Sequence, residues 1–154
     1  MKISGISTQT RPQVFHSNSW NLVVDEEIIR DLIDEAVKNA SNKARLCLHR
    51  GSEELMQVTY LAFVAPYEDQ IHSHPHRPEV LIPVLGDAEA RVFDYQGIVL
   101  STQIMRGKSG EAFSSAIGTW HGLKVLTPEF VMIEIGLGPF TSDSTVFLNQ
   151  KGGQ

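Results

Sequence analysis

From residue 44 onward the chain is divided into nine short apolar segments, and this division constrains the fold more than any other feature of the sequence. The segments are rich in Val, Ile, Leu, Phe and Tyr, and they predict strands at 44–50, 55–65, 68–74, 79–85, 88–95, 98–104, 111–116, 121–126 and 129–136. Turn-forming residues separate them, and Gln96-Gly97 between two of the segments predicts a hairpin. Many short strands joined by such turns are typical of a β-sandwich or a β-barrel.

One helix is predicted ahead of the strands, at residues 25–40. Asp25 is a suitable N-cap, and the acidic residues Glu26 and Glu27 suit the positive end of the helix dipole. Apolar residues recur at helical spacing and form one face: Ile28, Ile29, Leu32, Ile33, Ala36 and Val37.

The chain of 154 residues is long enough for one domain and its core. We divide it into an N-terminal arm or edge strand at 1–24, a single domain with its N-terminal helix at 25–142, and a C-terminal tail at 143–154, whose last residues we expect to be frayed.

Composition excludes several classes of partner. The formal net charge of -5 is unlike the basic surface that binds phosphate backbones, so we expect no nucleic-acid partner. The longest apolar runs are strand-sized, and no run reaches the roughly 20 residues of a membrane helix. The N-terminus lacks a secretory signal, and the single cysteine, Cys47, excludes an internal disulfide. Both features predict a cytoplasmic protein. We interpret Cys47 as a small buried hydrophobe rather than a reactive thiol.

Three histidines lie within five residues, at His72, His74 and His76, and Glu79 follows them. Side chains at i and i+2 of a strand point to the same face, so His72 and His74 can converge on one ion at about 2.0–2.2 Å. Pro75 cannot donate to a sheet and predicts the end of that strand. Glu79 begins the next strand and can face the same interior.

Two alternatives to this ligand arrangement stay open at the level of the residues. The histidines can be solvated or bonded to the backbone without binding a metal. The ligands can also be His74 and His76 with Glu79, which shortens the spacer to two residues and places a proline between the two histidines.

Two longer spacings match the two motifs of the cupin superfamily. The first is His72-x-His74, four residues, Glu79, six residues, Gly86, and the second is Gly110, five residues, Ala116-x-Gly118, two residues, His121. Three positions depart from the usual motifs, with Pro66 for glycine, Ala116 for proline and Val125 for asparagine. None of these departures removes a ligand.

The chain resembles the WbuC family of cupin-fold metalloproteins over residues 25–142. The matching residues are Arg45-Leu-Cys-Leu-His49, Gln57, the motif from His72 to Gly86, Gly118-Thr-Trp-His121, and the stretch from Glu134 to Gly138-Pro-Phe140. The resemblance implies a double-stranded β-helix, or jelly-roll barrel, with a metal inside. It implies His72, His74, Glu79 and His121 as the metal ligands.

Three neutral imidazoles and one carboxylate suit one divalent transition metal, and we expect zinc, nickel, iron or manganese. Such an ion lowers the pKa of bound water or polarises a carbonyl. Six further residues are candidate substrate contacts: Arg45, His49, Gln57, His76, Arg91 and Trp120.

Each of these contacts has a structural alternative. An exposed or structural role fits equally well for Arg45, Gln57 and Arg91. Trp120 can pack within the protein and fix its loop, or it can stack on a substrate. His49 lines the pocket mouth or ends a strand. His76 lies at the pocket rim or in a solvated loop, and His16, in the polar arm, has no predicted role.

We predict an enzyme that acts on a small polar molecule, such as a sugar or nucleotide sugar of a surface-polysaccharide pathway, because the resemblance implies that context. Metal-assisted isomerisation or epimerisation suits such an ion, although the sequence names no general base. The alternatives are an iron-dependent dioxygenase and a non-catalytic metal- or ligand-binding protein. We expect a homodimer, with residues 1–20 crossing onto a partner's sheet edge.

Overall fold

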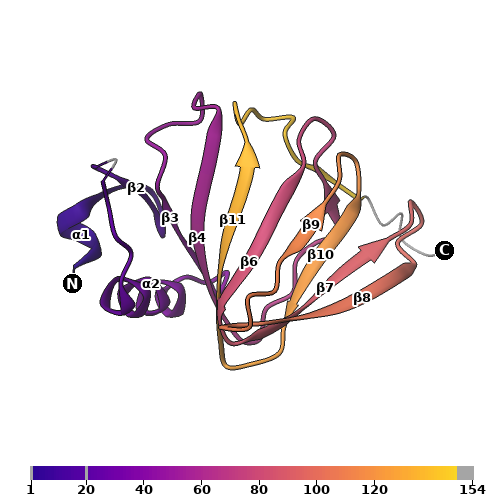
Figure 1. Ribbon diagram of the computed structural model, residues 1–154, viewed down its shortest axis with the longest axis horizontal. Coiled ribbons are helices and arrows are strands. Elements are labelled where there is room, and N and C mark those ends of the chain that lie inside the picture. The colour runs from indigo at the N-terminus through magenta and orange to yellow at the C-terminus, as the bar shows by residue number, and fades with distance from the viewer. Residues whose placement is uncertain (1, 20, 149–154) are drawn as a thin grey trace.

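Two β-sheets fold together into an open barrel, with one longer helix on the outer face of the larger sheet (Figure 1). The computed structural model describes residues 2–19 and 21–148. The elements in chain order are α1 (Ile3–Ile6), β1 (Ser7–Arg11), β2 (Val14–Ser17), α2 (Glu26–Lys38), β3 (Lys43–Cys47), β4 (Met56–Val64), β5 (His72–Ser73), β6 (Glu79–Leu85), β7 (Asp87–Phe93), β8 (Val99–Arg106), β9 (Phe113–Ser115), β10 (Trp120–Val125), β11 (Glu129–Leu137) and β12 (Val146–Phe147).

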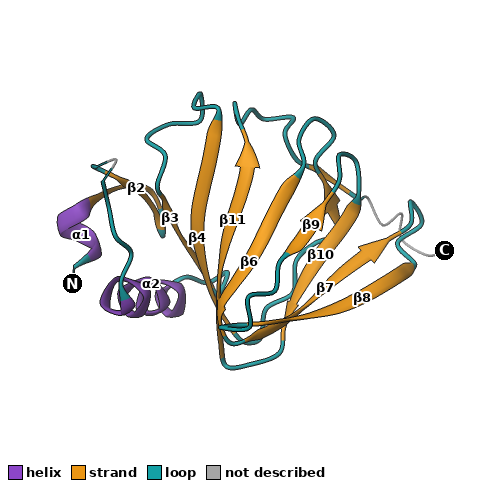
Figure 2. Ribbon diagram, in the orientation of Figure 1, coloured by secondary structure: helices purple, strands orange, loops and turns teal. Residues whose placement is uncertain are grey.

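The strand order differs from the chain order in both sheets. The larger sheet has the order β1-β2-β3-β4-β11-β6-β9, and the smaller sheet has the order β12-β5-β10-β7-β8. The neighbouring strands pair antiparallel, except that β2 and β3 are parallel. Figure 2 shows that strands dominate the architecture, as the sequence predicts.

The main apolar core lies between the two sheets. The larger sheet contributes Leu61, Phe63, Leu81, Phe113, Phe130 and Met132, and the smaller sheet contributes Ala88, Ala90, Met105, Leu123 and Val125. Full burial of a large apolar side chain is worth about 1.5–3 kcal/mol. This core occupies the interior that the functional site shares.

A second core lies between α2 and the outer face of the larger sheet. Ile28, Leu32 and Ala36 of the helix pack there with Leu46 of β3 and Val131 of β11. The helix begins at Glu26 because the side chain of Asp25 accepts a hydrogen bond of 3.0 Å from the backbone N–H of Ile28. The predicted helix and its N-cap are therefore confirmed.

The two ends of the chain are more ordered than the sequence indicates. Residues 2–17 form α1, β1 and β2, and β1 is an edge strand of the larger sheet. Near the other end, β12 pairs with β5, and Leu148 N–H donates to Ile71 O at 2.8 Å. The frayed end predicted at 150–154 lies outside the described residues.

The central strands largely follow the predicted ranges, with one clear exception. The segment 68–74 contains only the two residues of β5, together with an isolated bridge between Glu68 and Lys124. The predicted hairpin joins β7 to β8, and Gly97 at its turn has a φ of 83°. Within the described residues no helix is long and apolar enough to cross a bilayer.

Candidate metal centre

Four side chains from three strands and one loop converge inside the barrel, and we call His72, His74, Glu79 and His121 the four-residue centre. His72 lies in β5 and pairs in register with His121 of β10. His74 follows β5 directly, and Glu79 is the first residue of β6. His74, Glu79 and His121 are buried, whereas His72 is half-buried.

The geometry of the centre is tight. The ring centroids of His72 and His121 are 4.5 Å apart, and that of His74 lies 5.2 Å from His72 and 5.4 Å from His121. One nitrogen of each ring lies within 4.8 Å of the others. Glu79 joins the three rings, since its Oε1 lies 2.6 Å from His121 Nε2 and its Oε2 lies 3.1 Å from His74 Nε2.

The backbone fixes the orientation of all three imidazoles. The carbonyl oxygens of Gln70, Ser144 and Thr119 lie 2.8 Å from Nδ1 of His72, His74 and His121, respectively. A proton on Nδ1 donated to a carbonyl leaves the lone pair on Nε2, which is the tautomer that a metal ligand needs. The chain therefore presents three Nε2 atoms to one point.

In the four-residue centre, an ionised carboxylate lies beside the histidine rings. Burial opposes ionisation of Glu79, but the close imidazoles of His121 and His74 outweigh burial and lower the pKa of Glu79. Burial likewise favours neutral His121, but Glu79 outweighs it and raises the pKa of His121. Burial and the neighbouring His121 lower the pKa of His72, which keeps that ring neutral.

One atom shows that these residues fit a metal ion. His121 Nε2 is buried and makes no properly oriented hydrogen bond, although Glu79 Oε1 lies only 2.6 Å away. A ring nitrogen and a carboxylate oxygen that lie this close without a qualifying hydrogen bond suit two ligands of one ion. Three imidazole nitrogens and a carboxylate form a donor set that suits zinc, nickel, iron or manganese.

The centre opens into a cavity of about 970 Å³. Among the candidate substrate contacts, Arg45, His49 and Gln57 line this cavity. The amide of Gln57 donates to the carbonyl oxygens of three residues of one loop, including Glu54 at 2.8 Å. Its side chain therefore holds that loop. Burial lowers the pKa of His49, so this ring is neutral at the cavity wall.

The other three candidate contacts lie elsewhere. His76 is exposed and does not line the cavity. Arg91 lines a separate cavity of about 720 Å³ and pairs with Glu68 and Glu89. Trp120 is half-buried in β10, next to His121, and lines neither cavity.

The sequence-based reasoning missed a buried cation in the cavity wall, Arg77. Its guanidinium lies 3.4 Å from Glu134 and 5.0 Å from the ring centre of Phe140, and its Nε has no hydrogen-bond partner among the residues that the structure describes. Gly136 makes room for it, because a Cβ there would lie 2.9 Å from Arg77 Nη1. A lone arginine in a loop carries no sequence signal of burial, since arginine is usually exposed.

Comparison with known sequences assigns the chain to no protein family. No model of a known protein family matches this chain, and no curated protein matches it significantly.

Comparison with solved structures gives consistent matches. The capsular polysaccharide assembling protein CapF from Staphylococcus aureus matches with a TM-score of 0.61 and 17% identity, over 71% of this chain and 32% of CapF. KdgF from Halomonas sp. matches with a TM-score of 0.53 and 19% identity, over 66% of this chain and 83% of KdgF. A conserved protein with a double-stranded β-helix domain from Klebsiella pneumoniae matches with a TM-score of 0.56 and 17% identity, over 72% of this chain and 88% of that one.

Oxalate oxidase in complex with the substrate analogue glycolate also matches, with a TM-score of 0.54 and 15% identity, over 71% of this chain. This chain spans about a third of CapF and 57% of the oxalate oxidase chain. Identities this low show the fold alone. The chain therefore has the double-stranded β-helix fold of the cupins, as its two motifs predict.

Proposed function

We propose that the four-residue centre binds one divalent transition metal and that the protein is an enzyme acting on a small polar molecule in the adjoining cavity. The observation that carries this proposal is the convergence of three backbone-oriented Nε2 atoms and one carboxylate, with His121 Nε2 left without a hydrogen bond. A bound ion of this kind polarises a carbonyl or lowers the pKa of water.

The buried guanidinium of Arg77 supports a substrate that carries a carboxylate or phosphate. Its Nε is without a partner, and Glu134, its ion-pair partner, lines the same cavity. Arg77 binds the anionic group of the substrate and orients a neighbouring carbonyl or hydroxyl toward the four-residue centre. A sugar acid or a nucleotide sugar has both features. CapF, named for capsular polysaccharide assembly, shares the fold and agrees with this context.

A second candidate function is iron-dependent oxygen chemistry. Oxalate oxidase shares the fold and binds glycolate, a small carboxylate. Oxygen uptake that requires ferrous iron and substrate would favour this reaction over isomerisation. A protein that binds metal and ligand tightly, with no turnover under either condition, would be a binding protein instead.

Metal content tests the centre itself. Protein purified without a histidine tag is analysed as wild type, as His121→Ala, and as His76→Ala, whose exposed histidine makes a matched control. We expect His121→Ala to lose one equivalent of metal per chain and His76→Ala to lose none, because only His121 faces the centre. Retention of the full metal content after replacement of both His72 and His121 would contradict the proposal.

Thermal shift tests the substrate class. Sugar acids and nucleotide sugars are added to the metal-loaded protein and to Arg77→Lys, which keeps the charge but loses the planar donor fork. We expect a binding compound to raise the Tm of the wild type more than that of the variant. Equal shifts in both proteins would remove Arg77 from the substrate site.

We also propose that the protein works in the cytoplasm as a homodimer. The edge strand β1 exposes four of its five residues, and no strand of the described part of the chain pairs with its outer side, which suits pairing with a second copy. A monomeric mass by light scattering at micromolar concentration would contradict this arrangement.

A further inference from the structure

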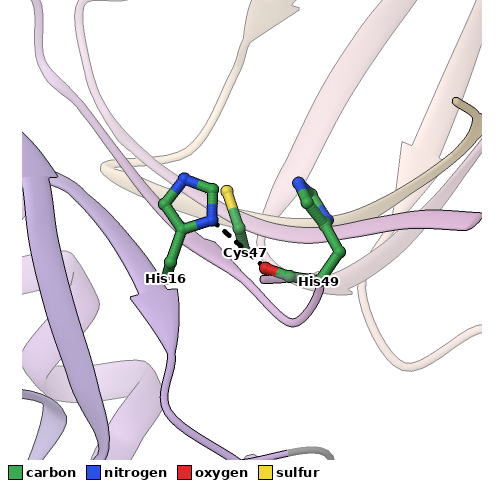
Figure 3. Close-up of side chains that lie close together, drawn as sticks. All are labelled: His16, Cys47 and His49. Carbon is green, nitrogen blue, oxygen red and sulfur yellow. Dashed lines mark hydrogen bonds between the residues drawn. The ribbon is translucent and has the colours of Figure 1, made fainter. Parts of the chain in front are cut away.

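Three ligand-type side chains form a second cluster, which we call the His–Cys–His cluster: His16, Cys47 and His49. One ring nitrogen of each histidine and the Cys47 sulfur lie within 4.8 Å of one another. Figure 3 shows the sulfur between the two imidazole rings. We propose that this cluster is a second metal site, separate from the four-residue centre, and that it binds a thiophilic divalent ion, with Zn²⁺ as the expected occupant.

The topology of the larger sheet assembles the cluster from distant parts of the chain. Strands β2 and β3 are parallel, and their register places His16 beside Cys47. His49 follows Cys47 by two residues, and its ring stands edge-on to that of His16 at a centroid distance of 5.5 Å. The N-terminal strand pair thus supplies one ligand, the end of β3 supplies the second, and the bend that follows β3 supplies the third.

Hydrogen bonds to the backbone orient both rings. Nδ1 of His16 donates to the carbonyl oxygen of His49 at 3.1 Å, which leaves the lone pair on Nε2. Nδ1 of His49 lies 3.2 Å from both the nitrogen and the carbonyl oxygen of Val58. The backbone N–H of Val58 donates to this Nδ1 in one tautomer, and in the other tautomer Nδ1 donates to the Val58 carbonyl oxygen and leaves Nε2 as the ligand atom, which is the tautomer that the proposed site requires.

Cys47 is buried, and polar ligand-type groups surround its sulfur. Cys47 is 6% exposed and is therefore a buried residue, as the sequence predicts, although neither of the two apolar clusters formed by the described residues includes it. Its sulfur lies beside two imidazoles and 3.8 Å from the hydroxyl of Thr59, which donates to it. On metal binding the Cys47 thiol would release its proton, and the resulting thiolate beside two imidazoles is a zinc ligand of the expected type.

The spacing of the cluster is close to that of a metal site. Tetrahedral ligands at 2.0–2.3 Å from an ion stand about 3.3–3.8 Å apart. The ligand atoms of the cluster lie within 4.8 Å of one another, so side-chain rotations that leave the strands in place bring them to this spacing. All three residues line the cavity of about 970 Å³. That cavity supplies water or a ligand atom for the fourth position, as in open zinc sites.

Cobalt substitution tests the proposal, because Cys47 is the only cysteine in the chain. A sulfur-to-cobalt charge-transfer band in the near ultraviolet therefore reports on the His–Cys–His cluster alone. Metal-free protein without a tag is titrated with Co²⁺ under anaerobic conditions. We expect two equivalents to bind and the charge-transfer band to appear.

Variants separate the two sites. Cys47→Ser and His16→Ala are each expected to lose the band and one equivalent of Co²⁺, whereas His121→Ala is expected to lose one equivalent and keep the band. His76→Ala, with an exposed histidine, is expected to keep both. Circular dichroism checks that each variant is folded. If Cys47→Ser is not folded, His16→Ala, at a half-buried position, carries the test instead.

Absence of the band from the wild type at saturating Co²⁺ would overturn the second site and leave the four-residue centre intact. Persistence of the band after His16→Ala would overturn the three-residue ligand set. Loss of Co²⁺ binding only in His121→Ala, with no band in any protein, would assign all metal binding to the four-residue centre.

Discussion

The four-residue centre and the His–Cys–His cluster lie on the wall of one cavity but differ in donor set and origin. The first combines three imidazoles with a carboxylate, and the second combines two imidazoles with a thiol. Nitrogen and oxygen donors suit several divalent metals, whereas sulfur selects thiophilic ones. The comparison teaches that one barrel can offer two sites of different metal preference.

The two sites also differ in how the chain builds them. Three of the four residues of the first centre lie between His72 and Glu79, so a strand, a turn and a second strand bring them together. In the second cluster, His16 meets Cys47 only because β2 and β3 pair in parallel. The first site thus depends on local geometry and the second on the docking of the N-terminal strands.

The largest expected effect is at Glu79. Glu79→Gln removes the carboxylate charge from between His74 and His121 while keeping its shape. We expect the metal affinity of the four-residue centre to fall by more than the roughly 10–100-fold that loss of an outer-shell partner costs. Competition with a chromophoric chelator measures this. The sulfur-to-cobalt band should be unchanged, and its loss would show that the two sites are not independent.

The next largest effect concerns the packing of α2 on the outer face of the sheet that carries the His–Cys–His cluster. Leu32 of α2 is fully buried against the sheet that carries Cys47, so Leu32→Ala should lower the free energy of unfolding by about 2–5 kcal/mol. The matched control is Val37→Ala, in the same helix but 64% exposed, which should change the stability far less. Urea unfolding measures both. Equal losses in the two variants would contradict the packing of α2 described above.

Two smaller effects, one at each site, concern the hydroxyl groups that contact the metal-ligand side chains. Thr59→Val removes the hydroxyl that donates to Cys47 Sγ, and Ser115→Ala removes the hydroxyl 3.3 Å from Nδ1 of His121. Each should weaken its own site by about 10-fold and leave the other unchanged. Cobalt titration reads out the two sites separately. Weakening of both sites by either variant would mean that they are coupled through the cavity.

The smallest effect is at the start of α2. The side-chain hydrogen bond from Lys2 and the backbone N–H of Ile28 lower the pKa of Asp25. A carboxylate whose folded-state pKa is depressed stabilises the fold above its unfolded pKa, near 3.9, and loses that contribution as the pH falls through the folded pKa. We expect Asp25→Asn to lower the Tm slightly at pH 7 and not at pH 2. A shift of equal size at both pH values would contradict an electrostatic contribution.

Much of the fold and part of the site could be predicted from the sequence. Helix α2 and the strands from β3 to β11, with the exception of the two-residue β5, follow local patterns, namely a capped amphipathic run and apolar segments between turns. The strand β12 could not be predicted, because the two residues that pair with β5 carry no local pattern. The parallel docking of β2, and with it the approach of His16 to Cys47, depends on contacts between distant segments. The buried position of Arg77 depends in part on Gly136, far along the chain, where a Cβ would lie 2.9 Å from Arg77 Nη1.

The most direct test of the central proposal is an anomalous difference map from a crystal of the metal-loaded protein, recorded on both sides of the absorption edge of the bound metal. We predict a peak about 2.0–2.2 Å from Nε2 of His72, His74 and His121, with Glu79 as the fourth ligand. A fully loaded crystal with no peak at that point, or with a peak held by His74 and His76 instead, would contradict the four-residue centre.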